Sequence, residues 1–246
     1  TQRNKYIAIV SVLKNMPKFK KLYDKYYTIL IDLSKSINAS DKGEKTETQQ
    51  KNWINFEDIQ KLQEDYMKII SNYKNKKSLN NEEYTNLLKT LVLSLYVDLP
   101  PRRNDYKNML IANNDKDLDP NFNYYIKNKN KFIFQNYKSV KTHGKQEIDI
   151  PENLQNIIKI YLKFYPNKDK EIKYFLVNYN GLEFKAINSL TYFLNSIFNK
   201  NISSTMLRHI YLDKYKNVKE EQAKDAKMMS HTIEMANAYV LKDKKE

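Results

Sequence analysis

The stretch that decides the fold is NEEYTNLLKTLVLSLYVDLPPRR, residues 81–103. Its first part, residues 81–97, has the helix formers and apolar spacing that predict a helix. This helix must end at Pro100-Pro101, because neither proline can continue it. Arg102 and Arg103 follow directly, so the end of the helix is expected to present two permanently charged guanidinium groups.

The composition favours a helical protein with a sizeable core. Hydrophobic residues make up 41% of the 246 residues and aromatic residues 13%, although the mean hydropathy is -0.78. Only three glycines and six prolines are present, which argues against a turn-rich sandwich or barrel. The chain has no cysteine, and this excludes disulfides, thiolate metal sites and a cysteine nucleophile.

The chain is strongly basic, with a formal net charge of +14 and a pI near 9.5. A surplus of this size predicts a polyanionic partner, most often nucleic acid. The alternative is a solvated basic surface in a lysine-rich protein encoded by AT-rich DNA. No apolar run approaches the length of a membrane span and no signal peptide is visible, so we expect an intracellular protein with no membrane partner. Because the chain begins with Thr1 rather than Met, we also expect it to be a fragment of a longer protein.

The organisation along the chain is helical, then sheet-like, then helical again. Apolar residues at helical spacing over residues 5–37 predict two helices divided at Pro17. Residues 40–51 are polar and typical of a linker, and Asn55 is expected to cap the helix after it. Short β-branched or aromatic segments within residues 107–150 predict a small antiparallel sheet with NKNK and KTHGK as turns. Further helices are predicted after Pro151 and over residues 187–199, 203–216, 218–229 and 231–241.

Four stretches carry side chains suited to chemistry on a phosphate. In the first, Arg102 and Arg103 have the forked donors that grip a phosphate, and Asp105 can orient Arg102. A surface salt bridge is the alternative interpretation. The second is YKSVKTHGKQEIDIP, residues 137–151, where a hairpin lysine can donate a proton or contact a phosphate. Its alternative is a lysine-rich hairpin that keeps a sheet edge soluble.

The other two stretches lie near the C-terminus. In SSTMLRHIYLDKY, residues 203–215, Arg208 and His209 interrupt an otherwise apolar helix that Ser203 or Ser204 can cap. A guanidinium there requires an anion, which is either a ligand or a buried carboxylate. In MMSHTIEMANAYV, residues 228–240, a histidine precedes a tyrosine on what is otherwise an ordinary amphipathic helix.

Taken in order, these stretches resemble the catalytic signature of the tyrosine recombinases, the phage-integrase family. That family has an arginine with an acid three residues later, a lysine on a β-hairpin, a His-x-x-Arg-His box, a Leu-Gly-His box and a C-terminal nucleophilic tyrosine. This chain has Arg-x-x-Asp in PPRRNDY, hairpin lysines, Leu-Arg-His in TMLRH, and Met-Ser-His followed by a tyrosine. It is similar to integrases of large DNA viruses, virophages and Crypton-type elements, over about residues 50–243.

The resemblance implies a role for each matching residue. The catalytic set is Tyr239 as nucleophile, Arg102, Arg208 and His231 as phosphate ligands, and Lys141 as general acid. Supporting or alternative positions are Asp105, Arg103, Lys145, Thr205 and His209. The sequence departs from the family in four places. Thr205 stands where a histidine is usual, and Met-Ser-His replaces Leu-Gly-His. The spacing from His231 to Tyr239 is one residue shorter than the commoner one, and the stretch between the first arginine and the lysine is long.

The implied fold is mainly α with a small antiparallel β-sheet. Its expected domains are the end of a helical DNA-binding domain over residues 1–40, a linker over 41–51 and the catalytic domain over 52–246. The implied function is site-specific recombination of double-stranded DNA through a 3′-phosphotyrosine, integrating a viral or mobile genome, by a homo-tetramer at DNA inside the cell. The resemblance implies no cofactor, no metal and no nucleotide. The alternatives are a type IB topoisomerase-like DNA-relaxing enzyme and a catalytically decayed DNA-binding module.

Overall fold

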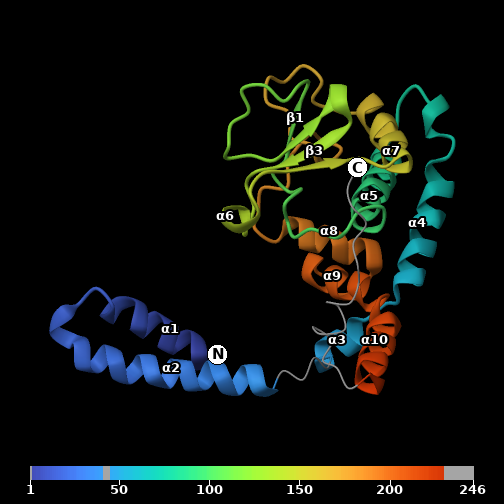
Figure 1. Ribbon diagram of the computed structural model, residues 1–246. Coiled ribbons are helices and arrows are strands. Elements are labelled where there is room, and N and C mark those ends of the chain that lie inside the picture. Colours follow the sequence, from blue (N-terminus) through green and yellow to red (C-terminus); the bar gives the residue numbers. More distant parts are fainter. Residues whose placement is uncertain (1, 41–44, 230–246) are drawn as a thin grey trace, which may run out of the picture. The chain divides into compact units, whose positions relative to one another are not determined.

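The chain divides into two units, Thr1–Lys51 and Asn52–Glu246. The computed structural model describes residues 2–40 and 45–229, the side chains of residues 36–40 excepted (Figure 1). The helix predicted over residues 231–241 therefore lies outside the described residues.

The first unit contains two helices that pack against each other, α1 (Gln2–Leu13) and α2 (Lys20–Ser40). They are separated by the short 3-10 turn η1 (Pro17–Phe19), so the predicted division at Pro17 is confirmed. Among the described residues of this unit, Val10 is the one buried hydrophobic side chain.

A short helix, α3 (Glu47–Asn52), occupies part of the stretch that was predicted to be a linker. Its beginning has a local cause in the sequence. The Gln49 backbone N–H donates to Thr46 Oγ1 at 3.2 Å, and the Thr46 N–H donates to Gln49 Oε1 at 2.8 Å. This reciprocal pair is a capping box, which satisfies two donors that a helix start leaves free.

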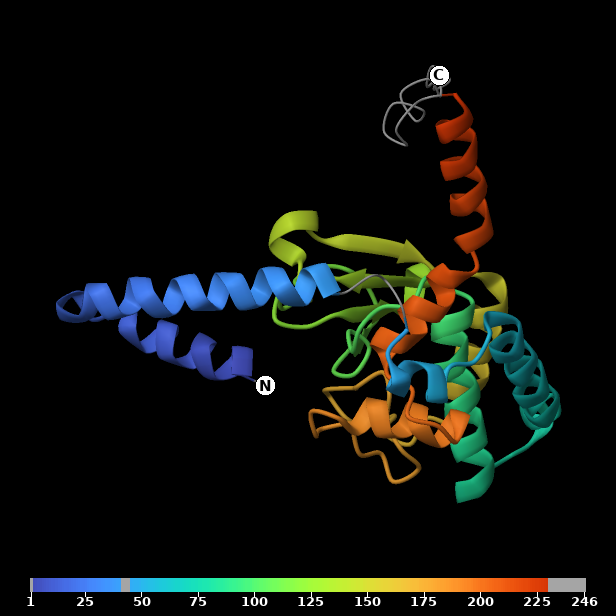
Figure 2. The ribbon, with the colours of Figure 1, turned by 90° about the horizontal axis from the view of Figure 1, so that it is seen from below.

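The second unit is built around α5 (Asn81–Val97), the helix predicted over residues 81–97. Asn80 and Glu83 form a second capping box at its start, and α4 (Phe56–Ile70) lies alongside it (Figures 1 and 2). Asn55 does occupy the cap position of α4, although its side chain makes no capping hydrogen bond. Between α4 and α5 lies the 3-10 turn η2 (Tyr73–Asn75).

The small sheet has the order β1-β2-β3-β4 and is mixed, so the prediction of a purely antiparallel sheet was wrong. Its strands are β1 (Leu110–Ala112), β2 (Tyr124–Ile126), β3 (Lys131–Phe134) and β4 (Gln146–Asp149). β1 pairs with β2 in parallel, whereas the other two pairs are antiparallel. The long connection between β1 and β2 returns the chain to the end of the sheet where β1 begins, so that β2 runs in the same direction as β1. A tight hairpin turn cannot do this. The other edge of β1 is occupied, because Ile111 N donates to Lys173 O and Phe175 N donates to Met109 O.

The predicted turns of the sheet have different outcomes. NKNK is a turn: η3 (Lys127–Lys129) and the left-handed Asn130, with φ of 47°, reverse the chain between β2 and β3. KTHGK is not a tight turn. The connection between β3 and β4 is long enough to form a helical turn, α6 (Val140–His143), which Gly144 ends at a φ of 66°.

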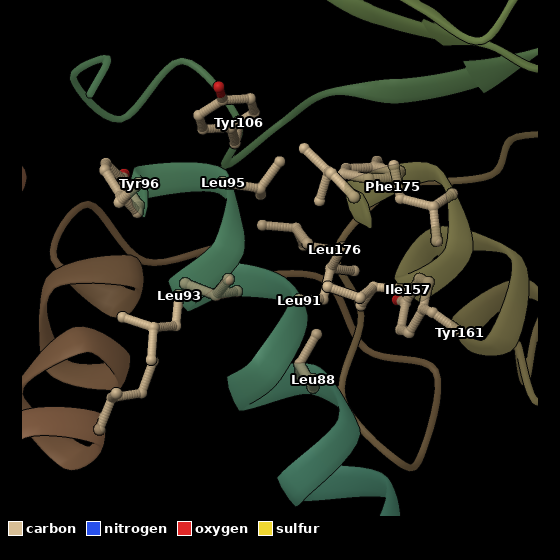
Figure 3. Packing of buried hydrophobic residues seen from close by; sticks show 14 of the residues in the cluster. Leu88, Leu91, Leu93, Leu95, Tyr96, Tyr106, Ile157, Tyr161, Phe175 and Leu176 are labelled. Carbon is tan, nitrogen blue, oxygen red and sulfur yellow. The ribbon is translucent and has the colours of Figure 1, made fainter. Parts of the chain in front are cut away.

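The core of this unit joins α5 to the sheet and to the later helices. Figure 3 shows Leu88 and Leu91 of α5 close to Ile157 and Tyr161, which belong to α7. The remaining helices are α7 (Glu152–Lys163), α8 (Ser189–Phe198), α9 (Ser204–Asp213) and α10 (Lys216–Met228). A smaller cluster around Tyr124, Ile126 and Ile133 packs separately from the α5 core. Tyr125 points to the opposite face of the sheet and packs into the α5 core. Both faces of the sheet are therefore covered.

Candidate active site

The loop after α5 is tied back to the helix that precedes it. Tyr96, fully buried at the end of α5, donates its hydroxyl hydrogen to the Arg103 carbonyl oxygen at 3.1 Å. Burial raises the pKa of Tyr96 well above its ordinary value, so the hydroxyl keeps its proton and stays a donor. The proline stop and this bond together fix where the two arginines leave the helix.

Arg102 is held from several sides. Its Nε donates to Asp105 Oδ2 at 3.0 Å, and its Nη1 donates to Gln146 Oε1 at 2.7 Å, at the start of β4. The guanidinium carbon lies 3.8 Å from the ring centroid of Phe134 and 4.9 Å from that of Tyr137. Only 14% of the side chain is exposed. A guanidinium that is stacked and bonded in this way has little rotational freedom left.

Helix α9 brings Arg208 to the same loop. Ser203 caps the helix by accepting from the Met206 N–H, as predicted. The next residue, Ser204, donates its hydroxyl to Asn104 Oδ1 at 3.1 Å, which links the start of α9 directly to the arginine loop. Arg208 is half-buried, since the buried residues Met206, Leu207 and Ile210 hold the opposite face of α9 in the core.

Arg208 is much less well bonded than Arg102. Its Nη2 donates to Thr205 Oγ1 at 3.3 Å. Its Nε is buried and has no acceptor among the residues that the structure describes. Burial lowers the pKa of Arg208 and the nearby charge of Arg103 lowers it further, while Asp105 and Tyr96 act in the opposite direction.

The cluster holds more positive charge than its carboxylate can neutralise. Asp105 lies within electrostatic reach of Arg102, Arg103 and Arg208, all of which lower its pKa. Burial nevertheless outweighs the three guanidinium groups, and the pKa of Asp105 is raised overall. An anion that entered this cluster would find charge and an unused donor already in place.

A hollow of about 500 Å³ opens beside the cluster. Arg103, Asp105 and Thr205 line it, together with Lys107 and Lys138. Lys138 belongs to the same lysine-bearing stretch as the predicted Lys141 and Lys145, but the sequence does not predict it. Nothing local distinguishes Lys138 from its neighbours, because the direction of a side chain in a long connection is set by tertiary contacts.

The two predicted lysines occupy different surroundings. Lys141 lies on α6 and is exposed, with no hydrogen bond or ion pair to any described residue. Lys145 is paired with Glu147, at 3.0 Å between Nζ and Oε1. Of these two, Lys141 is the one whose ammonium group is free to meet a ligand.

The structure thus brings five of the predicted residues together. Arg102, Arg103, Asp105, Thr205 and Arg208 form one cluster. His209 is exposed on α9, outside the buried face. His231 and Tyr239 lie outside the described residues, so the predicted late histidine and nucleophile are not located. In the described ranges, no three His, Asp or Glu side chains are grouped to hold a metal ion, and no helix is long and apolar enough to span a membrane.

Three further residues of the site had no visible signal in the sequence. Gln146 and Tyr137 hold the Arg102 guanidinium, as described above. Asn123, just before β2, donates to the Asp105 carbonyl oxygen at 2.9 Å. No protein-family model, no curated protein and no solved structure matches the chain.

Proposed function

We propose that the chain is a DNA strand transferase of the tyrosine-recombinase kind, whose substrate is the phosphodiester of double-stranded DNA. The observation that carries the proposal is the cluster around Asp105. Two arginine-bearing segments that lie far apart in the sequence meet there, and positive charge exceeds the single carboxylate. The net charge of +14 supports a polyanionic partner.

The proposed chemistry needs positive charge where the phosphate becomes more negative. Tyr239 Oη loses its proton to solvent and attacks phosphorus, and the P–O5′ bond breaks. The new P–Oη bond stores the energy for rejoining. Arg102 and Arg208 donate to the nonbridging oxygens, on which charge grows in the transition state. The departing 5′ oxygen takes a proton from a lysine, for which Lys138 and Lys141 are the candidates.

The unused donor on Arg208 supports this assignment over a purely structural role. A structural arginine in a protein interior is normally paired, because an unpaired buried donor destabilises the fold by about 1–3 kcal/mol. Arg208 instead meets only a weak acceptor, Thr205 Oγ1, among the described residues. A bound phosphate would supply the missing acceptor.

The larger architecture in this proposal follows the resemblance. Residues 52–246 are proposed to be the catalytic domain, and residues 1–40 the end of a DNA-clamping domain joined to it by residues 41–51. The mainly helical unit with a small mixed sheet is compatible with the tyrosine-recombinase fold. Strand exchange between two duplexes would take place in a homo-tetramer, with integration of a mobile or viral genome as its outcome.

The test is a covalent adduct on DNA. The protein is incubated with a pool of random-sequence duplexes that carry a 5′-labelled strand with a nick downstream, and the products are resolved on a denaturing gel. We expect a labelled protein band with the wild type and none with Tyr239→Phe. Tyr192→Phe is the matched control, since Tyr192 is an exposed tyrosine on α8. An undiminished adduct with Tyr239→Phe would reject the nucleophile.

Two other outcomes correspond to the alternative functions. A wild type that binds DNA in a salt-dependent way and forms no adduct is a non-catalytic DNA-binding module. A wild type that forms the adduct, relaxes supercoiled plasmid as a monomer and never joins strands from two duplexes is a type IB topoisomerase-like enzyme.

A further inference from the structure

Asn123 joins the two segments that carry the site residues. Its side chain is buried, with 6% exposure, just before β2. The amide nitrogen Nδ2 donates to the carbonyl oxygens of Asp105 and Asn136, each at 2.9 Å. The amide oxygen Oδ1 accepts from the backbone N–H groups of Gln135 at 3.0 Å and Asn136 at 2.9 Å. One side chain thus holds the arginine loop on one side and residues 135–136 on the other.

Residues 135–136 begin the connection that bears the candidate lysines. This connection, residues 135–145, runs from β3 to β4 and contains α6. It carries Lys138 and Lys141, and also Tyr137, whose ring lies against Arg102 and whose hydroxyl donates to Gly144 O at 2.7 Å. The position of the lysines relative to the arginines therefore depends on how the start of this connection is anchored.

An asparagine is suited to this place for a chemical reason. A side-chain amide has two N–H donors and an oxygen with two lone pairs, and Asn123 uses all four. Aspartate would keep the acceptors and lose both donors, while alanine would lose everything. A fully bonded buried group of this kind holds its neighbours in one arrangement.

We propose that Asn123 is a positioning residue, which fixes the lysine-bearing connection against the arginine loop so that a lysine can protonate the departing 5′ oxygen. This inference rests on the proposed function. Misplacement of a catalytic group by about 1 Å can slow a reaction about 100-fold. Loss of Asn123 should therefore affect proton transfer more than it affects phosphate binding.

The test compares two leaving groups at one scissile bond. Duplexes with random flanks carry either the normal 5′ oxygen or a 5′-bridging sulfur at that bond. With oxygen, Tyr239 Oη displaces an alkoxide, which must gain a proton as it leaves. With sulfur, the P–S bond breaks and a thiolate leaves unprotonated, because an alkyl thiol has a pKa of about 8.5. A defect in the proton donor is therefore rescued by sulfur, and a general defect is not.

Asn123→Ala should slow cleavage of the oxygen substrate about 100-fold, in the range of a general-acid contribution, and cleavage of the sulfur substrate less than about 3-fold. Asn123→Asp keeps the acceptor for the N–H groups of Gln135 and Asn136 but loses the donors to the carbonyl oxygens of Asp105 and Asn136. The link to the arginine loop is then broken, so an oxygen-specific loss should remain. Asn167→Ala is the matched control, since Asn167 is also buried and donates to a backbone oxygen, that of Gly181. It should change both rates by the same factor.

Amide hydrogen exchange gives a readout that needs no activity. In Asn123→Ala, the N–H groups of Gln135 and Asn136 lose their acceptor and should exchange faster, whereas Asn123→Asp should protect them. Exchange that stays at the wild-type rate in Asn123→Ala would overturn the anchor itself. Equal slowing of the oxygen and sulfur reactions would overturn the positioning role. A wild type that cleaves neither substrate would reject the proposed function and this inference with it, whatever the exchange rates.

Discussion

The two arginines at the centre of the cluster are held in opposite ways. Arg102 donates to Asp105 and Gln146 and is stacked on Phe134 and Tyr137, so the protein itself fixes its orientation. Arg208 has one long contact to Thr205 and a buried Nε without an acceptor in the described part of the chain. Burial and the charge of Arg103 lower the pKa of Arg208, which means that its surroundings disfavour the charged form.

From this difference we expect Arg102 to contribute mainly to the stability of the fold and Arg208 mainly to the binding of an anion. Arg102 contributes to the fold because Asp105 and Gln146 would lose their donor without it. Arg208 makes one long hydrogen bond among the described residues, so we expect it to contribute little to the fold. In the proposed function, a bound phosphate would supply the acceptor that its Nε lacks there. A site that is partly unsatisfied when empty binds the charged transition state more strongly than a site whose donors are already used.

The largest expected effect is that of Arg102→Met, which should reduce stability and activity together. Methionine keeps the stem of the side chain and removes all donors, so the buried Asp105 carboxylate is left unpaired. We expect a loss of about 2–3 kcal/mol in the free energy of unfolding, measured by urea denaturation, and loss of the covalent adduct. A variant as stable as the wild type would show that Arg102 is not the structural member of the pair.

The same substitution at Arg208 should leave the free energy of unfolding almost unchanged while it reduces adduct formation. Arg208→Met removes the unused donor and the repulsion from Arg103, so the free energy of unfolding should change by no more than about 0.5 kcal/mol, or rise. Adduct formation should fall about 100- to 1000-fold, as when one donor to a developing oxyanion is removed. If Arg208→Met is as unstable as Arg102→Met, the contrast between the two arginines is wrong.

The sequence predicted local features well and non-local features poorly. The helix over residues 81–97 was predicted to its ends, because an apolar run and a double proline act within a few residues. The capping box that begins α3 was equally readable in Thr46 and Gln49 but was hidden in a stretch judged to be a linker. The parallel pairing of β1 could not be predicted, since its other edge is bonded to residues 173–175, far along the chain.

The residues of the candidate site also fall into those predicted from local patterns and those missed because their roles are non-local. Arg102 and Asp105 were predicted as a pair because Asp105 comes three positions after Arg102, and the structure joins them at 3.0 Å. Arg208 was predicted from a charge that interrupts an apolar helix. Gln146, Asn123 and Lys138 were missed, because their roles depend on tertiary contacts between loops and not on any local pattern.

A smaller effect is expected from a phosphate analogue bound to the empty protein. Orthovanadate at ten times its dissociation constant should stabilise the wild type by about 1.4 kcal/mol, seen as a rise in the thermal midpoint at fixed ionic strength. Arg208→Met should lose most of this gain. Lys145→Met is the matched control, since Lys145 is paired with Glu147 outside the cluster. Equal stabilisation of the wild type and Arg208→Met would show that Arg208 does not bind the anion.

The smallest effect concerns Asp105, the carboxylate between the two arginines. Burial raises its pKa in the folded protein above the unfolded value of about 3.9, despite the opposing charges of Arg102, Arg103 and Arg208. A raised folded pKa contributes stability that is fully present below the unfolded pKa and is lost as the pH rises through the folded pKa. Asn at this position does not titrate.

The stability of Asp105→Asn relative to the wild type should therefore increase as the pH rises from about 3 to 7. Urea denaturation at several pH values measures this difference in the free energy of unfolding. A change in the hydrogen bond to Arg102 that does not depend on pH has no effect on the slope of the difference against pH. A difference that falls with rising pH would mean that the arginines stabilise the carboxylate more than burial disfavours it. Asp105 would then neutralise the cluster well, and Arg208 would have no unmet charge for a phosphate to satisfy.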